Sequence, residues 1–136
     1  MVSWCIGIDF GIKYWGLARG IYGIVEPIGS IAVVGGLPDW SKLHSLLKPW
    51  ACETWVIGMP LASNGDLLLP GRVLKRHWNM IQKKLGGTLI AVDESLTTIE
   101  ARAILLAQNV ELTKENIDAQ SACLILERFY DLYGSE

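Results

Sequence analysis

Three acidic residues occupy positions where a folded chain normally avoids a carboxylate, namely Asp9, Glu94 and Asp118. Asp9 closes an apolar run over residues 4–8, and Glu94 closes a second, mostly apolar run over residues 88–93. Asp118 lies near the start of the last predicted helix, on its apolar face. The residues that share this face at helical spacing are Ala122, Ile125 and Phe129. Strand ends and an inward helix face converge in an α/β fold, so we expect the three carboxylates to share one pocket.

Such a pocket favours metal-dependent chemistry. Buried carboxylates without partners cost several kcal/mol each, and their mutual repulsion raises their pKa values. A divalent cation removes both problems, and hard oxygen ligands suit Mg²⁺ or Mn²⁺. Two such ions held by clustered carboxylates catalyse phosphodiester hydrolysis. The residues therefore predict a nuclease-type site at which Asp9, Glu94 and Asp118 would hold the metal ions.

Each carboxylate also has a purely structural interpretation. Asp9 precedes Phe10 and Gly11, so it is also a suitable turn former. Strand alternation puts Asp93 and Glu94 on opposite faces without saying which of them faces the pocket. Asp118, near a helix N-terminus, is favourable for the helix dipole with no active site at all. These alternatives stay open on the residues alone.

Length and composition favour one catalytic domain over residues 1–136, because 136 residues suffice for a real core and 51% of them are apolar. No signal peptide or membrane-spanning stretch is evident. Cys5, Cys52 and Cys123 lack metal-site spacing and are interpreted as reduced core thiols, which predicts a cytoplasmic protein with no membrane partner. The formal charge of −2 gives no global attraction to nucleic acid, so any such binding needs a local patch.

The order of elements predicts an α/β fold with a mixed five-stranded sheet. The first third is typical of an antiparallel meander, with strands over residues 2–9, 15–19 and 25–34. Pro38 opens a short helix that ends at Pro49, with Leu43, Leu46 and Leu47 facing inward. Strands and helices then alternate in a βαβα pattern flanking the sheet. These segments are a strand at 54–58, a helix at 71–85, a strand at 88–93, a helix at 97–108 and a final helix at 116–133.

The helix at 71–85 carries a basic face opposite its apolar stripe. The basic face consists of Arg72, Lys75, Arg76, Asn79 and Lys83, and the stripe of Leu74, Trp78, Ile81 and Leu85. Such a face is either the solvated side of an amphipathic helix or a track for phosphates. His44 and His77 lack metal-ligand spacing and are interpreted as structural. Trp15 and Trp40 are expected in the core, although exposed tryptophans stack on bases.

Four blocks of sequence together resemble the YqgF/RuvX-like family of the ribonuclease H-like superfamily. They are Gly7-Ile8-Asp9-Phe10-Gly11-Ile12-Lys13-Tyr14-Trp15-Gly16-Leu17-Ala18; Val56-Ile57-Gly58-Met59-Pro60-Leu61 with Asn64-Gly65 after it; Asp93-Glu94-Ser95-Leu96-Thr97-Thr98-Ile99-Glu100-Ala101; and Ile117-Asp118-Ala119 followed by Ala122 and Leu126. The blocks occur in the family's order and cover almost the whole chain.

The resemblance implies a ribonuclease H-like fold and metal-dependent hydrolysis of nucleic acid. Members are described as Holliday-junction resolvases and as nucleases that mature the 5′ end of precursor 16S ribosomal RNA, which makes ribosomal particles possible partners. Asp9, Glu94 and Asp118 fall on the family's acidic positions, and this selects Glu94 over Asp93. The candidate nucleic-acid contacts are Lys13, Arg72, Lys75, Arg76 and Lys83.

Two departures from the family and two other functions are relevant. The family usually has an arginine directly after the strand-end glutamate, where this chain has Ser95, and the segment 67–70 is more apolar than expected. The run from Asp9 to Lys13 also resembles the phosphate-binding hairpin of sugar kinases and chaperone ATPases, but this chain is too short for their second domain. A catalytically weak module that binds ribosomal RNA is the other alternative.

Overall fold

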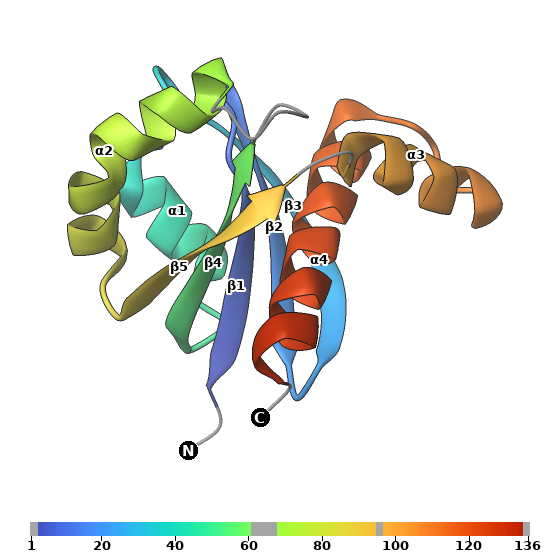
Figure 1. Cartoon of the computed structure of the whole chain (residues 1–136), viewed down its shortest axis with the longest axis horizontal. Helices are drawn as coiled ribbons and strands as arrows, with labels where there is room; N and C mark the ends of the chain where they lie inside the picture. The colour runs from blue at the N-terminus through green and yellow to red at the C-terminus, as the bar shows by residue number, and fades with distance from the viewer. Residues whose placement is uncertain (1–2, 61–67, 95–96, 135–136) are drawn as a thin grey trace.

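The computed structural model describes residues 3–60, 68–94 and 97–134, except the side chains of Pro60, Glu94, Thr97 and Thr98. The elements follow one another as β1 (Trp4–Asp9), β2 (Tyr14–Ile21), β3 (Ile24–Ala32), α1 (Trp40–Leu47), β4 (Cys52–Pro60), α2 (Leu69–Leu85), β5 (Thr88–Glu94), α3 (Thr97–Ala107) and α4 (Lys114–Tyr133). The strands form one sheet in the order β3-β2-β1-β4-β5 (Figure 1). The predicted mixed five-stranded sheet is confirmed.

The sheet changes direction at its central strand, β1. On one side β1 pairs antiparallel with β2, which pairs antiparallel with β3 across a tight turn at Tyr22 and Gly23. Both turn residues have positive φ (51° and 81°), as a two-residue hairpin turn requires. On the other side β1, β4 and β5 run parallel, so their carboxyl ends lie at the same edge of the sheet.

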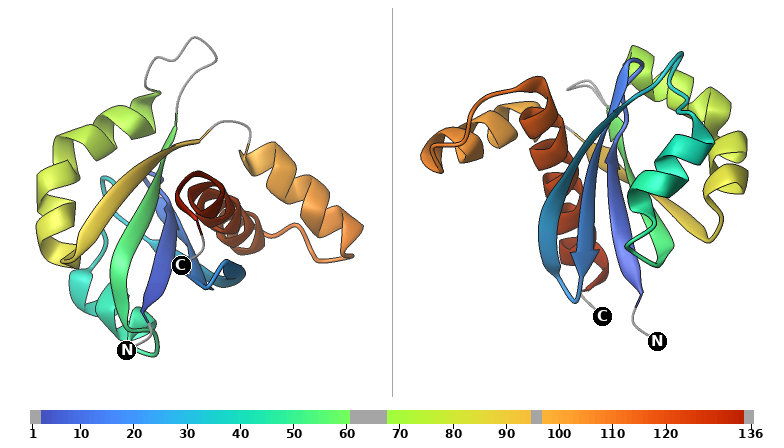
Figure 2. Two further views of the ribbon diagram at one scale, coloured as in Figure 1. Left: turned by 60° about the horizontal axis from the view of Figure 1, so that its bottom comes forward. Right: turned by 180° about the vertical axis from the view of Figure 1, so that it is seen from behind.

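Helices cover both faces of the sheet (Figure 2). On one face α1 and α2 enclose a core cluster that contains Ile6, Ile8 and Trp15. On the other face α4 lies directly on the strands, over a second cluster that contains Val56, Val92 and Leu126. Helix α3 packs on the outer side of α4 and projects away from the strands (Figure 1). The alternation of β1 therefore separates two apolar layers.

Details of several elements differ from the sequence-based expectations. Leu46 is 38% exposed, so its predicted inward orientation is wrong. Leu43 and Leu47 are the buried residues of α1, and Trp40 at its start packs against the same core cluster while remaining partly exposed. The last helix begins at Lys114 and not at 116, because Thr113 caps it by accepting a hydrogen bond from the Asn116 N–H at 3.1 Å. The expected burial of Trp15 is confirmed, and its indole N–H donates to the Gly36 carbonyl.

The cysteines are expected to be reduced core thiols, and no segment is expected to span a membrane. The three cysteines are free thiols, and burial raises the pKa of Cys52 and of Cys123 to about 12. These thiols therefore remain protonated at neutral pH and act as apolar core groups. None of the helices in the described ranges combines the length and the hydropathy that crossing a bilayer demands.

Candidate active site

Asp9 lies on the face of the sheet that α4 covers. Along β1, Ile6 and Ile8 point into the cluster under α1 and α2, whereas Cys5 and Gly7 face α4. Asp9 follows Cys5 and Gly7 in this alternation. It is half-buried, and its Cα pairs with Gly16 of β2 on one side and with Gly58 of β4 on the other. The residue thus stands at the carboxyl end of the central strand, between two glycines.

Glycines on β1 and β2 allow the backbone of α4 to approach the sheet closely. A Cβ at Gly7 would lie 2.6 Å from Leu126 Cγ, and a Cβ at Gly16 would lie 2.0 Å from the carbonyl oxygen of Asp118. The same Cβ at Gly16 would lie 3.0 Å from Asp118 Cβ. Because Gly16 is the pairing partner of Asp9, this close approach brings Asp9 and Asp118 together at neighbouring positions.

Among the described carboxylates of this region, that of Asp118 is the least solvated, with a side chain 8% exposed. Its Oδ1 accepts a hydrogen bond from Lys114 Nζ at 2.8 Å, while its buried Oδ2 has no hydrogen-bond partner within the described ranges. Ser121 Oγ, one helical turn further, is likewise buried and unpartnered there. A buried carboxylate oxygen without a donor is unfavourable unless a cation binds it, so this residue fits a ligand of a hard metal ion.

Glu94 ends β5, and its backbone pairs with Pro60. Its side chain lies outside the described part of the structure, as do Ser95 and the segment 61–67. The alternation of β5 bears on the choice between the two acids, because Ile90 and Val92 belong to the cluster beneath α4, and position 94 continues their series. Asp93 belongs to the opposite series and is exposed.

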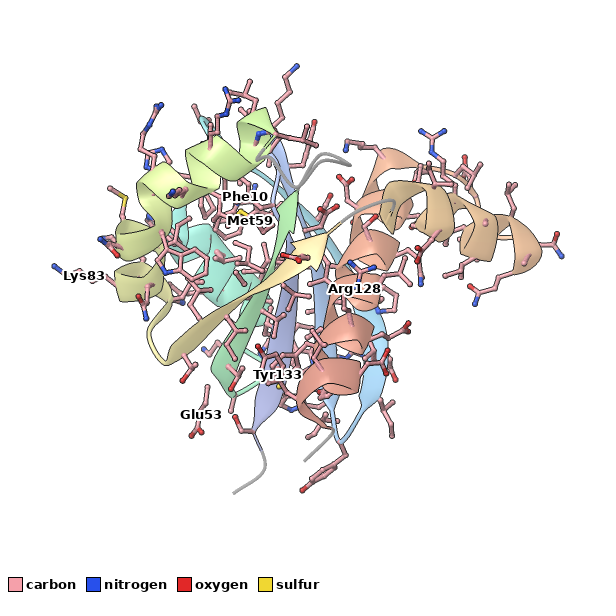
Figure 3. All side chains as sticks on the ribbon, viewed as in Figure 1. Phe10, Glu53, Met59, Lys83, Arg128 and Tyr133 are labelled. Carbon is pink, nitrogen blue, oxygen red and sulfur yellow. The ribbon has the colours of Figure 1, made fainter. Side chains whose placement is uncertain are left out.

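Arg128 of α4 extends toward the end of β5, where its guanidinium donates a hydrogen bond to the backbone carbonyl of Asp93 (Figure 3). Sequence reasoning did not assign this residue a role. Among the side chains that the structure describes, which exclude that of Glu94, no group of three His, Cys, Asp or Glu residues is arranged to hold a metal ion.

The predicted nucleic-acid contacts lie in two places. Lys13 is exposed in the turn after β1, beside the start of α4. Arg72, Lys75, Arg76 and Lys83 are exposed along α2, whose first turn lies near the carboxyl ends of β1 and β4. Figure 3 shows Lys83 at the opposite end of this helix, pointing away from the sheet. Of the four, Arg72 is therefore nearest to the acidic residues along the helix, and Lys83 is farthest.

The fold defined by this mixed sheet and its helices is ribonuclease H-like. The structure of Thermus thermophilus RuvC in complex with a Holliday junction substrate matches it with a TM-score of 0.57 at 11% identity, covering 98% of both chains. A second structure of Thermus thermophilus RuvC matches with a TM-score of 0.51 at 15% identity, again over 98% of both chains. At these identities the likeness concerns the fold alone.

Sequence comparison identifies the family. The family model RuvX, described as Holliday junction resolvase, matches residues 3–132, and the chain belongs to this family. A relative from Proteus mirabilis named "Putative pre-16S rRNA nuclease" is 35% identical over 93% of this chain and 94% of the relative. A relative of the same name from Colwellia psychrerythraea is 38% identical over 93% of this chain and 88% of the relative. The expected family membership is confirmed.

Proposed function

We propose that this protein is a nuclease that hydrolyses phosphodiester bonds with divalent metal ions, and that its substrate is the 5′ end of precursor 16S ribosomal RNA. One observation carries the proposal: Asp118 presents a buried carboxylate oxygen that no described group satisfies, beside the strand end that bears Asp9. The names of the relatives support the substrate, because both are called pre-16S rRNA nucleases. The site of action would be the cytoplasm, on RNA within or leaving ribosomal particles.

Three carboxylates would hold the metal: Asp9 from β1, Glu94 from β5 and Asp118 from α4. Bound Mg²⁺ or Mn²⁺, in one or two sites, supplies activation of the attacking water and stabilisation of the leaving oxygen. The protein provides the rigid frame, since Asp9 sits in a paired strand and Asp118 is fixed by the packing of α4 on Gly16. Arg128 would steady the end of β5 through the Asp93 carbonyl.

Basic side chains would bind the substrate backbone without reading its sequence. Lys13 and Arg72 come from the turn after β1 and from the first turns of α2, which border the acidic edge of the sheet. Lys75, Arg76 and Lys83 would continue the phosphate track along α2. Contacts of this kind position a nucleic acid and make its affinity depend on salt.

A second candidate function is cleavage of a branched DNA. It is favoured by the description of the family model as Holliday junction resolvase and by the likeness of the fold to that of RuvC, whose structure contains a Holliday junction substrate. The chemistry at the carboxylates would be the same, but a junction resolvase needs two sites that act together, so the protein would have to act as a dimer.

The test is a cleavage assay that offers a ribosomal RNA precursor and a four-way DNA junction, each with Mg²⁺, with Mn²⁺ and with chelator. We expect the wild type to shorten the RNA precursor only when metal is present, and Asp9→Asn to abolish this cleavage by at least 100-fold, roughly the loss that follows removal of a metal-holding or transition-state group.

The variant needs a measure of folding, since loss of activity alone is ambiguous. Asp9→Asn should retain the melting temperature of the metal-free protein or exceed it, because it removes one of the repelling carboxylates. If the protein cleaves the DNA junction and leaves the RNA precursor uncut, the second candidate function is favoured. Undiminished RNA cleavage by Asp9→Asn would show that Asp9 is only a turn residue and that the proposed site is wrong.

A further inference from the structure

Lys114 occupies the first position of α4, where the electrostatics of the helix disfavour a cation. The N-terminus of a helix carries partial positive charge, which attracts acids and repels bases. The favourable order of an i,i+4 pair also places the acid before the base, whereas here Lys114 precedes Asp118. Helix stability therefore gives no reason for this lysine. The reason lies in its contact with Asp118, because Lys114 Nζ is 2.8 Å from Asp118 Oδ1.

The ion pair engages only one of the two oxygen atoms of the Asp118 carboxylate. Oδ1 is bound to the lysine, and Oδ2 is buried without a partner in the described ranges. The two side chains differ strongly in exposure, since that of Asp118 is 8% exposed and packed over Gly16 while that of Lys114 is 68% exposed. The carboxylate is thus fixed, and the ammonium is the member of the pair that can move away.

A shallow cavity beside the ion pair offers the ammonium a second location. It is lined by Gly11, Ile12, Lys13, Tyr14, Pro70 and Lys114, and we refer to it as the Tyr14 shelf. Lys114 Nζ already lies 5.8 Å from the centroid of the Tyr14 ring, which is within the range of a cation–π contact. Tyr14 is 41% exposed, so the shelf is open to an incoming ligand.

We propose that Lys114 is a displaceable counter-ion that couples metal binding to substrate binding, an inference that rests on the proposed function. In the metal-free protein the ammonium neutralises Asp118. A divalent cation bound by Asp118 repels it onto the Tyr14 shelf, where Lys114 and Lys13 together bind a phosphate of the nucleic-acid backbone. Metal then raises the affinity for nucleic acid, and nucleic acid raises the affinity for metal by the same factor.

The coupling has a charge-based reason. Without metal, the acidic residues repel phosphate, and the lysine that would attract phosphate is engaged with Asp118. With metal, the carboxylate is neutralised by the stronger cation, and the lysine becomes available one helical turn away. Substrate binding and completion of the metal site therefore occur together. The Tyr14 shelf then does not hold RNA at a site that lacks the metal needed to cleave it.

The experiment compares Lys114→Met with Lys114→Arg and with the control Lys48→Met, an exposed lysine after α1 on the other face of the sheet. Metal affinity is measured without nucleic acid, from the rise in melting temperature on titration with Mn²⁺. Binding of a short single-stranded RNA is measured by fluorescence anisotropy with and without Mn²⁺ over a range of salt. A gel confirms that the RNA keeps its length during the measurement.

We expect Lys114→Met to bind Mn²⁺ about two- to five-fold more tightly, which is roughly the effect of removing one partly exposed ion pair. In Mn²⁺ it should bind RNA more weakly, with a salt slope smaller by about 0.7 for the lost phosphate contact. Without metal its RNA affinity should equal that of the wild type. Lys114→Arg should keep the metal-dependent gain in RNA affinity, and Lys48→Met should match the wild type throughout.

A structural lysine would give a different result. If Lys114→Met lowers the melting temperature equally with and without Mn²⁺ and leaves both affinities unchanged, the proposal is overturned. Asp118→Asn separates this failure from that of the proposed function. If Asp118→Asn loses its response to Mn²⁺ while Lys114→Met leaves both affinities unchanged, the metal site stands and only the counter-ion role of Lys114 is refuted. An Asp118→Asn that responds to Mn²⁺ like the wild type refutes the metal site itself.

Discussion

The side chain of Arg128 links the last helix to the end of β5. Its guanidinium donates to the Asp93 carbonyl, the peptide group that directly precedes Glu94. The family resemblance leads one to expect an arginine immediately after that glutamate, and this chain has Ser95 instead. Arg128 therefore brings a guanidinium to the same strand end from another element, and we infer that it takes over part of the work of the missing arginine.

Replacing Arg128 with Met should weaken both the fold and the metal response. Loss of the hydrogen bond should lower the free energy of unfolding by about 0.5–1.5 kcal/mol, as measured by urea denaturation. Because the end of β5 loses its anchor, the rise in melting temperature on addition of Mn²⁺ should also shrink. The matched control is Arg102→Met, which removes an exposed arginine from α3.

Adding Ser95→Arg to Arg128→Met tests whether the two positions are interchangeable. A partial return of the Mn²⁺ response in the double variant would support the compensation. If Arg128→Met matches Arg102→Met both in urea and in the metal titration, Arg128 is only a surface residue.

The choice between Asp93 and Glu94 shows how far individual residues can be predicted from sequence. Alternation along β5 predicts that the two acids face opposite sides, and this much follows from the strand alone. Which side faces α4 depends on the phase of the alternation, and that phase is visible only in the packing of Leu89 on one core cluster and of Ile90 and Val92 on the other.

Helix α4 is the element that brings distant parts of the proposed site together, and glycines make its position possible. Gly7 and Gly16 leave no side chain between the helix backbone and the strands. Both glycines belong to the first block of the family resemblance, but nothing in that block indicates what packs on them. No local pattern states that a helix more than 90 residues away will rest on Gly16, because that contact is tertiary.

Gly16→Ala should damage the fold and the site together. The new Cβ would lie 2.0 Å from the Asp118 carbonyl oxygen, so α4 must move. Overpacking of this kind costs about 1–3 kcal/mol, and the shift should also remove the stabilisation by Mn²⁺ and the cleavage of RNA. The free energy of unfolding, the metal titration and the cleavage assay measure the three effects.

Gly20→Ala is the matched control, because it also adds a methyl group beneath α4. There the new Cβ meets mainly the end of the Tyr130 side chain, at 2.7 Å, far from Asp118 along the helix. This variant should lose less stability and keep its response to Mn²⁺. A Gly16→Ala protein with normal metal binding would mean that the docking of α4 does not set the site.

Most elements were predictable because their signals are local, and the errors came from contacts at their ends. Alternation and turn residues predict the five strands, and apolar spacing predicts the four helices. A helix that begins at 116, as the sequence predicts, excludes Lys114 and with it the i,i+4 relation to Asp118, whereas α4 begins at Lys114. The capping residue Thr113 was the signal that would have placed it correctly.

The molecule as a whole carries a formal charge of −2, yet its basic residues are unevenly distributed. The basic face of α2 begins near the carboxyl edge of the sheet and ends at Lys83, far from it (Figure 3). From Arg72 to Lys83 the helix rises by roughly 16 Å. Binding along this face therefore depends on the length of the nucleic acid as well as on its charge.

Arg72→Ala and Lys83→Ala should differ in a length-dependent way. With a long RNA each variant should reduce the salt slope by about one unit per lost contact. With an RNA that is too short to extend from the carboxylates to Lys83, only Arg72→Ala should reduce the salt slope. Anisotropy titrations over a range of salt measure both slopes. Equal slopes for the wild type and both variants would show that the basic face of α2 is only solvated and does not bind phosphates.

The position of Asp118 on the last helix has a consequence for the timing of synthesis. Asp9 enters the growing chain 109 positions before Asp118, so at ~5–20 residues per second the two are made roughly 5–20 s apart. During that interval the strand bearing Asp9 exists without the helix that rests on Gly16. Under the proposed function, a nascent chain thus lacks the complete set of metal-binding carboxylates until Asp118 has been added. The delay before the carboxylate set is complete follows from the order of the elements along the chain and requires no inhibitor.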